Sequence, residues 1–157
     1  MTDRLVSEST DNLRDEQVIK AMTFEIDQVE YGIDIKDVRD IIRMQKIAYY
    51  PKQPNYVKGL INLRGKIIPT MDIGIKFNRT QKTFDDRTCI IVIEQEETTL
   101  GVIVDRINEV KTFAISEISD APNYQEGQVN EYLFGVGKTE EGYTLLLKTE
   151  KVMGHNE

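Results

Sequence analysis

The sequence predicts an all-β protein made of short strands. Short apolar segments recur along the chain, and polar or glycine-containing turns separate them. In one segment, residues 67–77, apolar residues recur with a period of two, the pattern of a strand with one buried face. Such regular spacing of short strands is typical of a β-sandwich or a small barrel. A chain of 157 residues is long enough to bury the core of one domain.

Further apolar segments form pairs, and each pair predicts a β-hairpin because a short polar turn separates its members. The pairs are residues 19–27 with 30–35, 88–94 with 98–105, and 132–138 with 143–148. Short helical pieces are expected at 35–43 and 116–118. Residues 78–87 are polar and lack periodicity, which predicts the most mobile connection of the chain.

The segment 57–75, VKGLINLRGKIIPTMDIGI, combines a tight turn with an alternating pattern. Gly65 ends the sequence Asn-Leu-Arg-Gly, where a residue free to adopt positive φ lets one strand turn into the next. Pro69 cannot donate a backbone hydrogen bond, so this strand is expected at a sheet edge or with a bulge. Arg64 lies at the turn, where its guanidinium can hold a carboxylate through two hydrogen bonds.

These residues resemble the central motif of the CheW family, the coupling proteins that link bacterial chemoreceptors to the histidine kinase CheA. The motif residues are Gly59, Asn62-Leu63-Arg64-Gly65, Pro69 and Asp72. Further segments resemble the opening hairpin, a later strand and the closing segment of the family. They are Phe24-Glu25-Ile26 with Tyr31-Gly32-Ile33-Asp34-Ile35, Gly101-Val102-Ile103-Val104-Asp105, and Tyr132-Leu133-Phe134-Gly135-Val136-Gly137.

The resemblance covers residues 17–153 and implies two intertwined, five-stranded SH3-like β-barrels that share a hydrophobic seam. The expected organisation begins with a mobile polar tail at 1–16. The first barrel is expected to comprise 17–66 and a C-terminal return at 143–153, in which the last strand rejoins it. Residues 67–142 are expected to form the second barrel.

The charge of the chain disfavours a nucleic-acid partner. A net charge of −7 lacks the basic surplus that binding to phosphates requires. The charge is unevenly distributed, however. The charged residues of segment 36–66 are mostly basic, and those of segment 94–131 are mostly acidic. The charge distribution by itself is explained by two solvent-exposed faces of opposite charge. The resemblance instead favours two surfaces that select different partners by charge.

The sequence shows no constellation that would support catalysis, a cofactor or a metal. The single histidine, His155, lies near the C-terminus, and Cys89 lies in an apolar run that predicts a small buried side chain. One histidine and one cysteine are too few for a zinc site. Residues 135–139 echo a phosphate-binding loop but lack its first glycine. A mechanism that uses two carboxylates stays open from the sequence, although no pair of acidic residues lies in a recognisable catalytic arrangement.

The sequence predicts a cytoplasmic protein without direct membrane insertion. No apolar stretch approaches the roughly 18 residues needed to span a bilayer. The N-terminal residues 1–16 also lack the apolar centre of a signal peptide. The resemblance adds recruitment to arrays of membrane receptors.

The resemblance also implies which residues meet each partner. The cytoplasmic tip of methyl-accepting receptors is expected to bind at an apolar groove between the barrels, formed with Val38, Asp40, Ile41, Arg64, Ile107 and Val110. Within this set, Asp40 and Arg64 are expected to approach each other and form a salt bridge at the rim. The regulatory domain of CheA is expected to contact Lys58, Gly59, Ser119, Asp120, Ala121, Pro122 and Tyr124.

The loop 118–124 departs from the common pattern of the family. Ser119 stands where many relatives have arginine, and Asn123 stands where many have an acid. An apolar anchor by Tyr124 is therefore expected in place of an ion pair.

Two alternatives remain at this point. The same fold forms the coupling half of CheV proteins and the regulatory domain of CheA. The chain contains no kinase, phosphotransfer or receiver segment, so a free-standing coupler is expected if it is complete. A small β-barrel that binds RNA by aromatic stacking is the other alternative, which the acidic charge disfavours.

Overall fold

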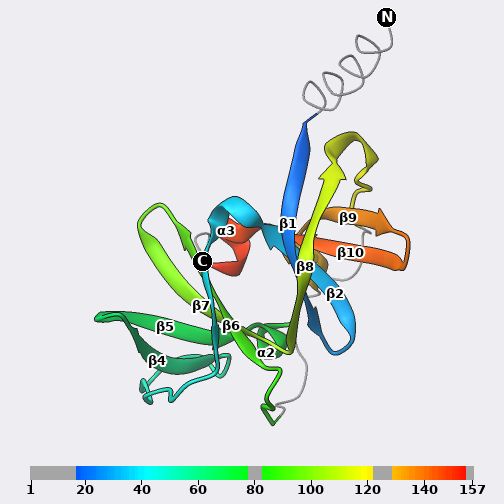
Figure 1. The fold of residues 1–157 in the computed structure, drawn as a ribbon. Coiled ribbons are helices and arrows are strands. Elements are labelled where there is room, and N and C mark those ends of the chain that lie inside the picture. The colour runs from blue at the N-terminus through cyan, green and yellow to red at the C-terminus, as the bar shows by residue number, and fades with distance from the viewer. Residues whose placement is uncertain (1–16, 78–82, 122–128, 155–157) are drawn as a thin grey trace, which may run out of the picture.

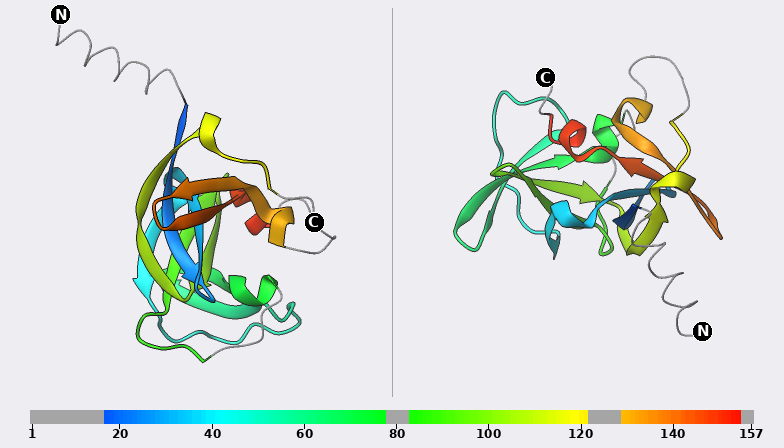
Figure 2. Two further views of the ribbon diagram at one scale, coloured as in Figure 1. Left: turned by 90° about the vertical axis from the view of Figure 1, so that its right-hand side faces the viewer. Right: turned by 90° about the horizontal axis from the view of Figure 1, so that it is seen from above.

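The computed structural model describes residues 17–77, 83–121 and 129–154 (Figure 1). Strands in these residues form two five-stranded sheets, which Figure 2 shows as two bodies side by side. The prediction of an all-β fold is confirmed.

The first sheet contains the two N-terminal strands and the last three strands of the chain. They are β1 (Val18–Ile26), β2 (Val29–Asp34), β8 (Arg106–Ala114), β9 (Leu133–Thr139) and β10 (Gly142–Leu147). Their order in the sheet is β8-β1-β2-β10-β9, and β10 runs parallel to β2. The predicted return of the last strand to the first barrel is therefore confirmed.

The second sheet contains five strands that are consecutive in the chain. They are β3 (Val38–Arg43), β4 (Val57–Leu63), β5 (Lys66–Asp72), β6 (Cys89–Gln95) and β7 (Thr98–Val104). Their order is β3-β6-β7-β5-β4, so β3 and β4 form the two edges. Residue Ala48, beyond the end of β3, also pairs with Leu60 of β4 through two backbone hydrogen bonds of 2.8 Å, which draws these edges together.

Short helices lie between the strands and after the last strand. They are η1 (Ile35–Asp37), α2 (Ile73–Lys76), η2 (Ile115–Glu117), η3 (Val129–Tyr132) and α3 (Thr149–Val152). Helix α2 begins where Asp72 Oδ1 accepts hydrogen bonds from the backbone of Gly74 and Ile75, at 2.9 and 3.3 Å. This cap is the usual role of an aspartate before the first helical residue.

The predicted division of the chain between the barrels is wrong. Strands β3 and β4 lie with β5–β7, whereas β8 and β9 lie with β1 and β2. The chain crosses from the first sheet to the second at η1 and returns after β7. Strand pairing depends on contacts distant in sequence, which the local pattern of apolar residues does not contain.

The segment 67–77 also differs from its prediction. The strand ends at Asp72, and its buried face includes Ile68, which is 2% exposed, while Ile67 is 57% exposed. Between residues 68 and 72 the strand is covered on both faces, because Ile68 packs inside the second sheet and Met71 packs toward the first. Pro69 precedes the residues that pair with β7, so β5 has only its β4 partner there.

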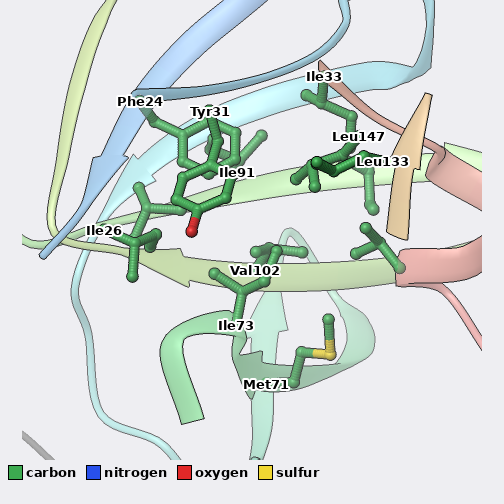
Figure 3. Packing of buried hydrophobic residues seen from close by; sticks show 13 residues of the cluster. Phe24, Ile26, Tyr31, Ile33, Met71, Ile73, Ile91, Val102, Leu133 and Leu147 are labelled. Carbon is green, nitrogen blue, oxygen red and sulfur yellow. The ribbon is translucent and has the colours of Figure 1, made fainter. Parts of the chain in front are cut away.

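The largest core cluster draws on both sheets (Figure 3). Phe24 and Tyr31 of the first sheet pack in the same cluster as Ile91 and Val102 of the second. Separate, smaller clusters contain Ile61 with Ile90 in the second sheet and Ala21 with Leu146 in the first. The expected hydrophobic seam between the barrels is therefore present, and we call this largest cluster the seam.

Candidate partner-binding surfaces

The residues predicted to bind a receptor lie mainly on two edge strands. Strand β3 is an edge of the second sheet, and β8 is an edge of the first. Val38 of β3 and Ile107 of β8 both pack against the seam, so the two strands approach it from opposite sheets. Ile41 and Val110 keep 37% and 45% of their surface exposed. Val38 and Ile107 thus contact the seam, and Ile41 and Val110 are exposed on the same two strands.

A bulge in β8 places Ile107 and Val110 on one face. Val110 lies opposite Met22 of β1, and Ile107 lies opposite Phe24, so two residues of β8 face Thr23 alone. Met22 and Phe24 are two residues apart and share a face, and residues directly opposite each other in a sheet share a face as well. Without the bulge, side chains three residues apart would point to opposite faces.

A second bulge does the same in β3. Val38 pairs with Ile93 of β6, and Ile41 pairs with Ile91, with a register shift between Val38 and Asp40. Ile91 and Ile93 both belong to the seam, so Val38 and Ile41 lie on the face that looks toward it. Bulges at sheet edges commonly redirect side chains in this way.

The predicted ion pair between Asp40 and Arg64 is confirmed. Arg64 Nη1 donates to Asp40 Oδ2 at 2.7 Å, and the backbone of Ile41 donates to Asp40 Oδ1 at 2.8 Å. The hydrogen bond from Arg64, followed by that from Ile41, lowers the pKa of Asp40 below its ordinary value. Because Asp40 is on β3 and Arg64 follows β4, the ion pair joins the two edges of the second sheet.

The turn that carries Arg64 requires positive φ at both central positions. Arg64 has a φ of 53° and Gly65 a φ of 85°, as in a type I′ hairpin turn. Asn62 Oδ1 accepts a hydrogen bond of 2.9 Å from the backbone of Gly65. This geometry projects the Arg64 side chain from the end of the hairpin, where it reaches Asp40.

Basic side chains of residues 36–66 are partly neutralised within the protein. Arg39 Nε lies 2.7 Å from Glu94 Oε1, and Lys66 Nζ lies 4.0 Å from Glu94 Oε2. Arg64 is bound to Asp40. The local surplus of positive charge is therefore smaller at the surface than the sequence suggests.

The expected first kinase contact lies on β4, where Lys58 interrupts the register with β5. Gly59 is buried, with a φ of 147°. A Cβ atom at this position would lie 2.0 Å from the backbone oxygen of Ala48. Gly59 thus allows the segment after β3 to pair with β4, while Lys58 is the more accessible of the two residues.

The expected second kinase contact begins on the first sheet. Ser119 pairs with Val136 of β9 through backbone hydrogen bonds of 2.9 and 2.8 Å. Ser119 and Asp120 are exposed, and Ala121 packs against the seam. Residues 122–124, which include Pro122 and Tyr124, lie outside the described residues.

The described residues contain no group of three or more His, Cys, Asp or Glu side chains that could hold a metal ion. Burial raises the pKa of the Cys89 thiol, and nearby Arg43 offsets this only in part. A raised pKa disfavours the reactive thiolate. Cys89 is half-buried, where the sequence predicted a buried side chain, and His155 lies outside the described residues.

A family model named CheW-like domain matches residues 20–157. The chain belongs to the CheW family. It is 31% identical over 136 residues to a chemotaxis protein CheW of Klebsiella aerogenes, covering 87% of this chain and 82% of the relative. It is 30% identical over 149 residues to the CheW of Treponema pallidum, covering 92% of this chain and 87% of the relative.

A solved CheW structure has the same architecture. The scaffolding protein TtCheW of Thermoanaerobacter tengcongensis superimposes with a TM-score of 0.80 at 28% identity, over 89% of this chain and 95% of that one. The sequence resemblance to CheW is confirmed, as is the expected pair of SH3-like barrels. CheW membership gives the chain a scaffold or adaptor role in chemotaxis, and the alternatives considered from the sequence are not favoured.

Among the residues that the structure describes, no helix has the length and apolar character to cross a bilayer.

The Asp40–Arg64 pair should show a small but measurable coupling. In a double-mutant cycle with Asp40→Ala and Arg64→Ala, we expect an interaction of about 1 kcal/mol or less in the free energy of unfolding, since exposed ion pairs contribute little. The coupling should shrink in high salt. Because the folded-state pKa of Asp40 is lowered, this contribution is present above the unfolded pKa and is lost as pH falls through the folded pKa. Strictly additive effects at neutral pH and low salt would contradict the coupling.

Proposed function

We propose that this chain is a non-enzymatic adaptor that couples the cytoplasmic tip of methyl-accepting chemoreceptors to the histidine kinase CheA. The observation that carries the proposal is the match of the CheW-like domain over nearly the whole chain. The adaptor works in the cytoplasm and joins membrane-receptor arrays. It acts by holding its partners together, which raises their effective concentration without any chemistry of its own.

The receptor tip binds where the two edge strands border the seam. Val38 and Ile41 on β3, with Ile107 and Val110 on β8, offer apolar side chains that the bulges turn to the seam face. An amphipathic helix, such as the tip of a receptor, lays its apolar side into a surface of this kind. The ion pair of Asp40 with Arg64 forms the polar rim.

The kinase binds at two separate places, one on each sheet. The first is around Lys58 on β4, with Gly59 setting the backbone there. The second is the loop of residues 118–124, with Ser119, Asp120, Ala121, Pro122 and Tyr124; Ser119 pairs with β9. Because the two places lie on different barrels, one adaptor can touch two kinase molecules and extend an array.

The test is whether receptor and kinase bind at the same time. We expect a labelled receptor cytoplasmic fragment and the regulatory domain of CheA to form a three-component complex with this chain. Each fragment should leave the affinity of the other nearly unchanged. Analytical ultracentrifugation with two labels would reveal the complex. Stoichiometric displacement of one fragment by the other would contradict the model of two surfaces.

A further inference from the structure

A half-buried carboxylate, Glu30 of β2, accepts hydrogen bonds from side chains on two other strands. Asn108 Nδ2 of β8 donates to Glu30 Oε1 at 2.8 Å, and Thr144 Oγ1 of β10 donates to Glu30 Oε2. Lys111 Nζ of β8 lies 3.0 Å from Oε2 and 3.3 Å from Oε1. The side chains of Glu30 and Lys111 are only 18% and 16% exposed. We call these four residues the Glu30 cluster.

The Glu30 cluster reaches past a strand. Strand β8 pairs with β1 and has no second strand partner among the described residues, while β2 lies on the far side of β1 (Figure 1). Two residues of β8 nevertheless bind one side chain of β2. Because β8 is an edge strand, its backbone is hydrogen-bonded only to β1 in the part of the chain that the structure describes, and the contacts with Glu30 add a second attachment to the sheet.

The contacts depend on the bulge of β8. Asn108 and Lys111 are three residues apart, so in a regular strand they would point to opposite faces. With the bulge opposite Thr23, both reach Glu30. Thr23 supports the same irregularity, since its hydroxyl donates to the backbone oxygen of Glu109 and accepts from Glu109 N at 3.1 Å. The Glu30 cluster therefore depends on the bulge, and the side chains of Asn108 and Lys111 tie the bulged part of β8 to β2.

The same bulge sets the face of Ile107 and Val110. We infer that Glu30 is a positioning residue that fixes the bulge of β8 and so orients these two side chains for the receptor. The inference rests on the proposed receptor-binding role of β8. Glu30 itself lies on β2 and acts on the receptor surface through Asn108 and Lys111.

The charge state of Glu30 suits this role. Burial raises its pKa, but hydrogen bonds from Thr144, Lys111 and Asn108 outweigh burial and leave the pKa below its ordinary value. Two other ion pairs lie close to the Glu30 cluster. Lys111 Nζ is 3.8 Å from Glu141 Oε1, and Arg106 Nε is 3.9 Å from Glu25 Oε2. Removing Glu30 would leave the Lys111 ammonium half-buried beside only the exposed Glu141, and such a broken pair destabilises its surroundings more than a lost surface pair does.

The test compares Glu30→Ala with Glu141→Ala, which removes a charge near Lys111 but leaves the Glu30 cluster intact. Affinities for a receptor cytoplasmic fragment and for the CheA regulatory domain are measured separately, with amide hydrogen exchange of residues 106–114. We expect Glu30→Ala to speed exchange in β8 and to weaken receptor binding about tenfold, the size of effect seen for residues outside a contact. Kinase affinity should stay within about twofold, and Glu141→Ala should change neither property.

Two results would overturn the inference. One is normal exchange in β8 of Glu30→Ala, which would show that the Glu30 cluster does not hold the bulge. The other is faster exchange with unchanged receptor affinity, which would leave Glu30 with a purely structural role. If Glu30→Ala does not fold, Glu30→Gln decides by the same measurements, since it keeps an oxygen to accept from Asn108 but loses the charge. Failure of the unmodified chain to bind the receptor would refute the proposed function, whereas the exchange data would still test the Glu30 cluster.

Discussion

Replacing Gly59 with alanine should destabilise the folded protein by about 3 kcal/mol, through backbone strain and lost hydrogen bonds. Its Cβ atom would lie 2.0 Å from Ala48 O and 2.8 Å from Ile47 Cγ2, so the segment after β3 must move away from β4. The two backbone hydrogen bonds between Ala48 and Leu60 would be lost with that movement. For a chain of this size, such a loss lowers the melting temperature by about 10 °C.

Gly142→Ala is a matched control for Gly59→Ala. Gly142 has a φ of 143°, close to the 147° of Gly59, but a Cβ atom there would meet nothing within 4 Å. Both substitutions carry the strain of positive φ, so the difference between their melting temperatures isolates the contact with Ala48. Equal melting temperatures in a thermal melt would show that the contact contributes little. If Gly59→Ala proves stable yet binds CheA poorly, Gly59 acts at the kinase surface directly.

The bulges also explain two errors made from the sequence. Residues 35–43 were expected to be helical, yet only Ile35–Asp37 is helical, and β3 follows. The strand β8 was not expected at all. In both strands the apolar residues that share the seam face, Val38 with Ile41 and Ile107 with Val110, are three apart, which is the spacing of one face of a helix. A bulge produces the same spacing in a strand, so the sequence pattern cannot separate the two structures.

The predicted hairpins are confirmed because their information is local. Strands β1–β2, β6–β7 and β9–β10 form adjacent antiparallel pairs, with the short turns that the sequence indicated. The assignment of β3, β4, β8 and β9 to barrels was wrong because strand pairs such as β8 with β1 are set by contacts distant in sequence. The loop of residues 78–87 is only partly described, from residue 83 onward.

The candidate receptor surface came from family resemblance, and only the strand register shows why its residues share a face. Val38 and Ile41 could equally be core residues when taken from the sequence alone. Their cross-strand partners, Ile93 and Ile91, place them toward the seam. The Glu30 cluster has no sequence pattern that would reveal it, because Glu30 and Thr144 are 114 positions apart.

Val110→Asp should weaken binding of the receptor fragment by about 30-fold or more. Val110 is 45% exposed at the border of the seam, on the same face as Ile107. A receptor helix docked there would bury the new carboxylate without a basic or hydrogen-bonding partner. Loss of a central apolar contact alone commonly costs about 2 kcal/mol of binding free energy. Stability should change little, because Val110 is already partly solvated in the free protein. Titrations with a labelled receptor fragment and with the CheA regulatory domain measure the two affinities, and a thermal melt measures stability.

Phe134→Asp provides the control for Val110→Asp. Phe134 is 43% exposed and lies on β9, at the edge of the first sheet opposite to β8. The substitution Phe134→Asp therefore introduces the same charge at a similarly exposed apolar site away from the proposed groove. Receptor affinity should remain within about twofold. Equal losses for both variants would indicate a general effect of negative charge on binding. Receptor affinity unchanged by Val110→Asp, in a folded protein, would remove β8 from the receptor surface and leave β3 as the strand to test.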